Sequence, residues 1–136
     1  MATKATNGDD KITGTKFKDK LFGKGGDDVI KGLAGNDTIR GDAGNDKLTG
    51  GDGADTFVFG KNSGKDTITD FDVKKDVIEI AKGLNGIKKA SDVLKHADQK
   101  GKDVVIDLGG GNKITLKDVK ISELKKNPGD HFDITS

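Results

Sequence analysis

An aspartate recurs every nine residues through the first half of the chain, and an apolar residue stands two positions after each copy. Most of these aspartates have a glycine two positions before them and another five positions before them. A strict short period is typical of solenoids, in which each repeat must stack on its neighbours to bury its apolar face. The period therefore predicts a stack of small coils. Its Asp/apolar pairs are Asp10/Ile12, Asp19/Leu21, Asp28/Ile30, Asp37/Ile39, Asp46/Leu48 and Asp55/Phe57.

Each unit divides into a turn and a very short strand. Glycines at fixed positions permit positive φ, so the first six residues can form a tight turn that ends at the aspartate. Side chains alternate in direction along the last three residues, which places the apolar eighth residue inside and its two neighbours in solvent. A looser seventh unit spans 64–69, after a two-residue insertion. The predicted core is Ile12, Leu21, Ile30, Ile39, Leu48, Phe57 and Ile68, and the predicted outward residues are Lys11, Lys20, Lys31, Arg40 and Lys47.

The aspartates form two rows of like charge. Two units make one coil, so Asp10, Asp28 and Asp46 stack on one side and the intervening aspartates stack on the other. Successive coils lie about 4.8 Å apart, and carboxylates at that spacing repel one another. A hard divalent cation between the turns removes the repulsion, and Ca²⁺ accepts an irregular set of carbonyl and carboxylate oxygens better than Mg²⁺ does. The chain has no Cys and only two His, so any metal must be held by oxygen.

A metal-free solenoid is the alternative, in which the aspartates serve only in Asx turns. Asn or Ser would serve that role at some copies, yet every copy in the row is Asp. This uniformity favours calcium.

The unit has the form G-G-x-G-x-D-x-U-x, with U apolar, most plainly at 32–40 and 41–49. At its first and fourth positions only Ala5 and Phe17 are not glycine. In this form it resembles the RTX, or hemolysin-type, calcium-binding nonapeptide repeat. The resemblance implies an all-β fold, a parallel β-roll similar to the C-terminal modules of type I secreted proteases, lipases, adhesins and alginate epimerases.

The resemblance also implies which residues hold the ions. In this family each Ca²⁺ takes the second and fourth carbonyls and the Asp of one turn, with the first and third carbonyls and the Asp of the turn one coil later. On one side the sets are Thr6, Gly8 and Asp10 with Gly23, Gly25 and Asp28; Lys24, Gly26 and Asp28 with Gly41, Ala43 and Asp46; and Asp42, Gly44 and Asp46 with Asp66. On the other side they are Thr15, Phe17 and Asp19 with Gly32, Ala34 and Asp37, and Leu33, Gly35 and Asp37 with Gly50, Asp52 and Asp55. The set with Phe17 is the weakest, because a bulky residue resists the φ of the glycine it replaces. About four to six ions are expected.

From Asp70 onward the nine-residue period stops. We expect residues 1–69 to form the repeat roll and residues 70–136 to form a C-terminal cap, because an open solenoid end exposes core and strand edges. A hairpin is expected from 104–108 and 113–116, across the glycines between them. The cap is therefore predicted to be β-rich.

One or two short helices are also expected in the cap. Ser91 predicts a capped helix that ends by Gly101, and Ser122 predicts a further helical turn. Ser91, His96 and Asp98 have the residue types of a hydrolase triad, but residues five apart on a helix do not face each other. No nucleophile elbow precedes the serine. We therefore expect no enzyme activity from this chain.

Two functions are expected. The first is a calcium-binding RTX β-roll module that folds on calcium binding in the extracellular space, as the C-terminal part of a type I secreted protein. The tail resembles the export segment of that family, which makes the type I secretion machinery a partner. The second is a polysaccharide-binding module in which calcium is structural and the outward basic residues hold an alginate-like polyanion.

Other partners and compartments are not expected. The first twenty residues contain no apolar run of a secretory signal, and no later segment is long enough to span a bilayer. Lysine and arginine nearly balance the acidic residues, with a net charge of +1. We expect a secreted, extracellular monomer with no nucleic-acid partner and no membrane span.

Overall fold

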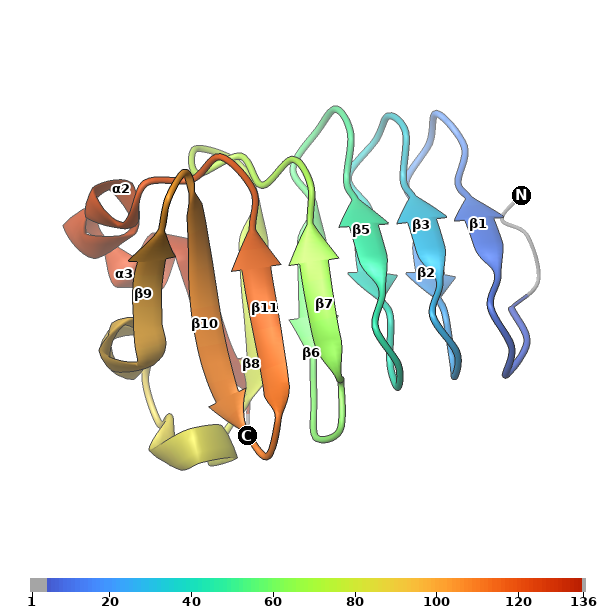
Figure 1. Cartoon of the computed structure of the whole chain (residues 1–136). Coiled ribbons are helices and arrows are strands. Elements are labelled where there is room, and N and C mark those ends of the chain that lie inside the picture. The colour runs from blue at the N-terminus through green and yellow to red at the C-terminus, as the bar shows by residue number, and fades with distance from the viewer. Residues whose placement is uncertain (1–4, 136) are drawn as a thin grey trace.

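The computed structural model describes residues 5–135, so the parts of the expected roll and cap at 1–4 and at Ser136 lie outside the described residues. The chain winds into a roll of two sheets that lie one behind the other (Figure 1). One sheet has the order β1-β3-β5-β7-β11-β10-β9 and the other has the order β12-β8-β6-β4-β2. Successive short strands alternate between the sheets, and the prediction of an all-β parallel β-roll is confirmed. The alternating short strands are β1 (Lys11–Thr13), β2 (Lys20–Phe22), β3 (Val29–Lys31), β4 (Thr38–Arg40), β5 (Lys47–Thr49), β6 (Thr56–Phe59) and β7 (Lys65–Ile68) in residues 1–69, followed by β8 (Val77–Ala81).

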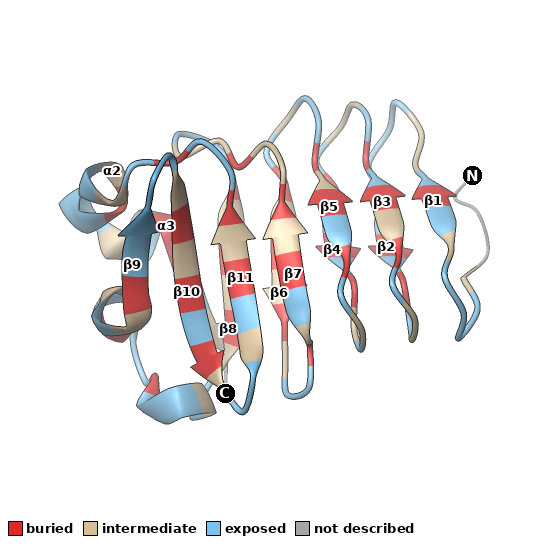
Figure 2. Cartoon of the chain, in the orientation of Figure 1, coloured by how far each residue is buried: buried red, intermediate tan, exposed pale blue. Residues whose placement is uncertain are grey.

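The apolar residue in each repeat strand lies between the two sheets. In one sheet Ile12 pairs with Ile30, Ile30 pairs with Leu48, and Leu48 pairs with Ile68. All seven predicted core side chains are buried, with exposures of 0–1%. Lys11, Lys20, Lys31, Arg40 and Lys47 are exposed, as predicted. Figure 2 shows the consequence, because the buried positions of neighbouring strands line up across the sheet.

The second half of the chain continues both sheets. It adds β9 (Ala97–Lys100), β10 (Asp103–Gly109) and β11 (Asn112–Leu116) to one sheet and β12 (Phe132–Thr135) to the other. β11 pairs with β7, and β8 pairs with β6, so the cap and the roll share one apolar core. The predicted hairpin is confirmed, since β10 and β11 are antiparallel neighbours. The helices are η1 (Leu84–Gly86), α1 (Ala90–Val93), η2 (Leu94–His96), α2 (Ile121–Lys126) and α3 (Pro128–His131).

The helix expected at Ser91 is shorter than predicted. It begins at Ala90, with Lys89 and not Ser91 at its N-cap, and helical structure ends at His96. Ala97 to Lys100 form β9 because they pair with β10, an interaction with residues distant in sequence. Ser122 likewise lies inside α2 and caps nothing. Among the described residues no helix has the length and apolar character needed to cross a membrane.

Candidate calcium sites in the stacked turns

The turns between strands stack in two rows along the edges of the roll (Figure 1). Each turn is tied to the turn one coil away by backbone hydrogen bonds. The N–H of Val29 donates to the carbonyl of Asp10 at 2.9 Å, and the N–H of Lys47 donates to the carbonyl of Asp28 at 2.8 Å. Row 1 contains the turns 5–10, 23–28, 41–46 and 60–66, and row 2 contains the turns 14–19, 32–37, 50–55 and 70–76.

One oxygen of each repeated aspartate joins its turn to the turn before it. Oδ1 of Asp28 accepts a hydrogen bond from the backbone N–H of Asp10 at 2.8 Å, and Oδ1 of Asp46 accepts one from Asp28 at 2.8 Å. The same contact recurs in both rows as far as Asp66 and Asp76. The repeat pattern did not reveal this ladder, which gives the carboxylates a structural role beside any metal.

The second oxygen of the inner aspartates is buried and has no hydrogen-bond partner among the described residues. A buried carboxylate oxygen without a donor or cation is costly. The same oxygen lacks a partner in five neighbouring repeats, so this is a property of the turn conformation and not of one residue. The atoms are Oδ2 of Asp28, Asp37, Asp46, Asp55 and Asp66.

A carbonyl of the next coil faces the same space as this second oxygen. A Cβ on Gly32 would lie 2.5 Å from Oδ2 of Asp37 and 2.7 Å from the carbonyl oxygen of Gly50, one coil further on. Two acceptors therefore converge where the described structure supplies no donor. Carboxylate and carbonyl oxygens are the ligands that Ca²⁺ takes, so the residues in these turns fit the ion.

The turn backbone also presents its fourth residue to the coil beside it. A Cβ on Gly26 would lie 2.5 Å from the carbonyl oxygen of Gly8, and those on Gly44 and Gly53 would likewise meet the carbonyls of Gly26 and Gly35. Glycine is required here, because φ is +90° at Gly26 and any side chain would collide with the neighbouring turn. The fourth carbonyls therefore line the space between coils, where the resemblance expected ligands.

The second residue of these turns is also left-handed, which the glycine pattern did not predict. Lys24, Leu33 and Asp42 have φ of 68°, 69° and 63°. Their carbonyls are among the expected ligands. Oδ1 of Asp42 pairs with Nε of Arg40 at 3.0 Å, and the expected ligand of this residue is its backbone carbonyl.

The outer turns differ from the inner ones. Oδ2 of Asp10 and of Asp19 accepts a hydrogen bond from a threonine within the same turn. At the other end, Asp70 accepts from the N–H groups of Gly50 and Gly51 at 2.9 and 2.7 Å, and Oδ2 of Asp76 accepts from Asp72. Asp70 and Asp76, which join the end of row 2 by these hydrogen bonds, are not among the ligands that the resemblance implies. The spacing of Asp76 and Ile78, which repeats the Asp-x-apolar pattern, is the signal that could have found the second of them.

Burial and mutual repulsion make these carboxyls weak acids. Burial raises the pKa of Asp46 and of Asp55 to about 7 and that of Asp66 to about 8, and neighbouring carboxylates add to the rise. Burial also raises the pKa of Asp28 and of Asp37. Within residues 5–135 no group of three or more His, Cys, Asp or Glu side chains gathers around one point. The candidate sites would therefore combine pairs of carboxylates with backbone carbonyls.

We expect the calcium-free chain to gain folded structure as the pH falls from about 8 to about 5. An unfolded Asp has a pKa of about 3.9, so in this window the folded chain binds protons that the unfolded chain does not. Folding is then favoured by falling pH, and the contribution is lost above a pH of about 8. Circular dichroism of the metal-stripped chain at several pH values measures this. The double variant Asp46→Asn/Asp66→Asn should flatten the dependence, and a folded fraction that rises with pH would contradict it.

Comparison with known proteins places this geometry among known folds. Residues 5–39 and 32–61 match the family described as the RTX calcium-binding nonapeptide repeat (4 copies). The structure is similar to the extracellular lipase LipA from Serratia marcescens, with a TM-score of 0.78 and 26% identity over 96% of this chain and 21% of the lipase. It is also similar to the AlgE6R3 subunit of the mannuronan C5-epimerase from Azotobacter vinelandii, with a TM-score of 0.64 and 28% identity over 95% of this chain and 78% of that subunit. The AlgE6R2 subunit of an epimerase from the same organism matches in fold, with a TM-score of 0.59 and 24% identity over 88% of this chain and 89% of that subunit. A comparison with curated protein sequences finds no match.

The matched repeats include Asp28, Asp37, Asp46 and Asp55, which are four of the five aspartates whose Oδ2 lacks a partner. The chain spans 21% of the length of the lipase, so the likeness covers a module of that enzyme and not the whole of it. The repeat sequence, the alternating parallel strands and the glycine-lined turns agree with one another. Residues 5–61 therefore carry RTX calcium-binding nonapeptide repeats, and the chain forms a parallel β-roll similar to the matched lipase and epimerase modules.

Proposed function

We propose that this chain is a folding module of a secreted protein, in which calcium assembles the coils in the extracellular space. The chain would form the C-terminal part of a protein exported by the type I route, and it would supply no catalysis itself. The observation that carries the proposal is the set of buried Oδ2 atoms without a partner in the inner turns. Cations bound between successive turns would give these oxygens a ligand.

The repeat half has few other means of holding itself together. Its first five strands are three residues long, and each of them contributes one buried apolar side chain at its centre. So little apolar burial does not offset the conformational entropy that the glycine-rich turns lose on folding. Metal binding would then supply the folding free energy. Extracellular calcium modules bind with Kd of about 10⁻⁴–10⁻³ M, which would leave the chain loose in a cytosol before export.

The test is a metal titration of the full chain followed by circular dichroism. We expect strand structure to form as calcium is added, to be lost on chelation, and not to form with Mg²⁺ at the same concentration, because Mg²⁺ demands a regular octahedral site. Isothermal titration calorimetry on the same samples gives the number of ions. A strand signal that survives exhaustive chelation would show that the roll does not depend on metal.

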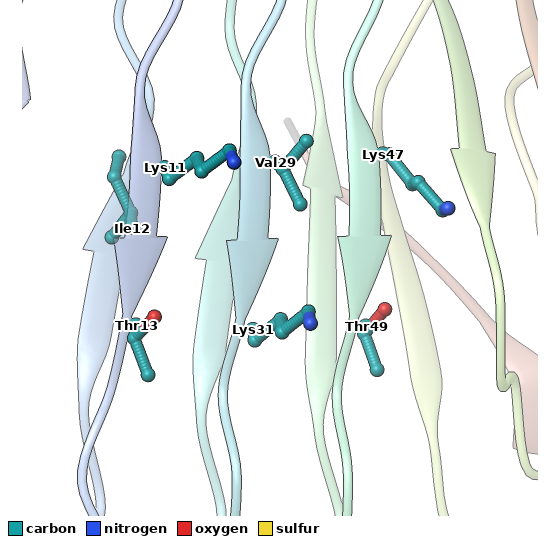
Figure 3. A pocket seen from close by; sticks show the side chains of 7 residues that line it. All are labelled: Lys11, Ile12, Thr13, Val29, Lys31, Lys47 and Thr49. Atoms are coloured by element: carbon teal, nitrogen blue, oxygen red, sulfur yellow. The ribbon is translucent and has the colours of Figure 1, made fainter.

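A polysaccharide-binding module is the second candidate, and one surface favours it. The outer face of the sheet β1-β3-β5 is hollowed, and lysines from all three strands border the hollow (Figure 3). It has a volume of about 270 Å³, and a second hollow of about 350 Å³ continues past β5 to β7 and β11. An extended acidic polymer could lie along these hollows with its carboxylates beside the ammonium groups. The basic residues that border them are Lys11, Lys31, Lys47, Lys65 and Lys117.

Retention on immobilised alginate separates this candidate from a plain folding module. The calcium-loaded chain should elute at higher salt than its net charge of +1 would predict, and Lys11→Gln/Lys31→Gln/Lys47→Gln should remove the excess. Lys74→Gln/Lys75→Gln/Lys82→Gln is the matched control, because it removes the same charge from exposed sites elsewhere. Equal loss of retention in both triple variants would leave only nonspecific charge attraction.

A further inference from the structure

The first coil holds its turns differently from every later coil of the repeats. In the turns 5–10 and 14–19 the second residue is threonine. Its backbone N–H donates to Oδ2 of the aspartate that ends the turn, at 2.7 Å for Thr6 and Asp10 and 2.6 Å for Thr15 and Asp19. The threonine hydroxyls contact the same carboxylates at 2.9–3.2 Å. Both carboxylates are therefore satisfied within their own turns.

Oδ2 of Asp19 occupies the position at which Oδ2 of the later aspartates has no hydrogen-bond partner. A Cβ on Gly14 would lie 2.7 Å from Oδ2 of Asp19 and 2.8 Å from the carbonyl oxygen of Gly32. Oδ2 of Asp37 has the same relation to the carbonyl of Gly50. The geometry is shared, but among the repeated aspartates from Asp10 to Asp66 the donor within the turn is present only in the first coil.

The backbone of the two outer turns also departs from the later ones. In the turns 23–28, 32–37, 41–46 and 50–55 the second and fourth residues all have positive φ. Within the described chain, Thr6, Gly8, Thr15 and Phe17 do not. The second and fourth carbonyls of the first coil are therefore oriented by a different turn from the one that lines the inner gaps.

Threonine at the second position explains the difference. A β-branched residue strongly disfavours positive φ, and threonine forms local hydrogen bonds to nearby backbone and carboxylate groups instead. Phe17 adds a second obstacle in row 2, because it stands where the later turns have a left-handed glycine. The sequence thus selects a turn whose carboxylate needs no cation.

We propose that the first coil, residues 5–22, is a metal-free cap of the roll, and that calcium sites begin at the third turn. The inference rests on the proposed calcium-dependent folding and narrows it. Thr6 and Thr15 supply Asp10 and Asp19 with the donors that a cation would replace elsewhere. The first coil is then held by hydrogen bonds within its own turns. It needs no calcium ion between itself and the next coil.

The proposal fixes the number of ions expected in the full chain. Each row has three gaps between successive turns, and the first gap of each row is closed by threonine. Four gaps remain, between 23–28 and 41–46, 41–46 and 60–66, 32–37 and 50–55, and 50–55 and 70–76. We therefore expect four calcium ions, where equal use of all gaps would give six.

Native mass spectrometry and calorimetry of the calcium-loaded full chain test this. Asp10→Asn/Asp19→Asn should keep the ion count of the unmodified chain, because Asn still accepts from threonine. Asp37→Asn/Asp46→Asn should lower the count. A count of six in the unmodified chain, or a lower count in Asp10→Asn/Asp19→Asn, would overturn the metal-free cap while leaving calcium-dependent folding intact. Failure to bind any calcium would overturn the proposed function itself.

Variants that gain calcium sites give a stricter test. Thr6→Gly removes the hydroxyl contacts with Asp10 and permits the left-handed turn, in which the backbone N–H at this position need not donate to Asp10, so we expect one additional ion. Thr15→Gly/Phe17→Gly should add another in row 2. Thr13→Gly/Thr38→Gly makes the same chemical change in two strands and should leave the count unchanged. Folded variants that bind no additional ion would count against the proposal. If a variant does not fold, the number of ions bound by the unmodified chain decides between four and six sites.

Discussion

A chain that ends at Thr69 is expected to stay largely unfolded at calcium concentrations that fold the full chain. Removal of residues 70–136 takes β11 away from β7 and β8 away from β6. Phe57 and Ile68 are fully buried in the full chain and would lie at an open end. Phe57 would also lose Phe71, whose ring lies 6.4 Å from its own. A short solenoid without a template at its end nucleates poorly.

Circular dichroism during a calcium titration measures this loss, and a pair of point variants in β11 separates docking from chain length. Ile114 is fully buried against β7, whereas Lys113, its neighbour in the strand, is exposed. Ile114→Asn places an amide in the core at a cost of about 3–5 kcal/mol and should raise the calcium midpoint strongly. Lys113→Asn introduces the same residue on the outer face and should leave it nearly unchanged.

The contrary result would be informative about the division of the chain. If the chain ending at Thr69 folded with an unshifted calcium midpoint, residues 70–136 would be an export segment or a separate unit. The pairing of β7 with β11 would then be a consequence of folding and not a requirement for it.

The roll could be predicted from the sequence because its structure is local and repeated. Each unit specifies its own turn and strand, and stacking copies of one unit places Ile12, Ile30 and Leu48 in register without further information. The period of nine and the alternation of side chains were therefore sufficient to identify the core and the two rows of turns.

The cap was less predictable because its strands are specified by distant partners. Ala97 to Lys100 follow a helix and have a pattern that continues it, yet they pair with β10. Ser91 and Ser122 are of a residue type that is common at helix N-caps. In both helices, however, a lysine occupies the N-cap position. Local propensity did not decide these boundaries, because pairing with a neighbouring strand outweighs it.

Within the site, the rows of aspartates were predictable and the differences among them were not. Nothing in the spacing distinguishes Asp19 from Asp37, since both end a turn of the same length. The distinction comes from the second residue of the turn, Thr15 against Leu33, a position at which neither turn has the glycine of the repeat form. The ladder of Asp Oδ1 atoms was also hidden, because it depends on contacts between coils.

Asp46→Ala is expected to raise the calcium midpoint about tenfold or more, a change of about 1.4 kcal/mol or more in binding free energy. Asp46 lies inside row 1, is 3% exposed and can serve the gaps on both of its sides. Its loss removes a carboxylate from two candidate sites and leaves the N–H of Asp28 without its acceptor. Asp37→Ala should act similarly in row 2, where Oδ1 of Asp37 accepts from Asp19.

Two further variants show which of these losses matters. Asp46→Asn keeps an oxygen that can accept from Asp28 but removes the charge, so a raised midpoint in this variant would assign the effect to the cation and not to the ladder. Asp10→Ala removes a carboxylate that is only half-buried and already bonded to Thr6, and it should shift the midpoint least. The midpoints come from circular dichroism titrations under one buffer condition. Equal shifts for Asp10→Ala, Asp37→Ala and Asp46→Ala would contradict both the sharing of ions between neighbouring coils and the metal-free first coil.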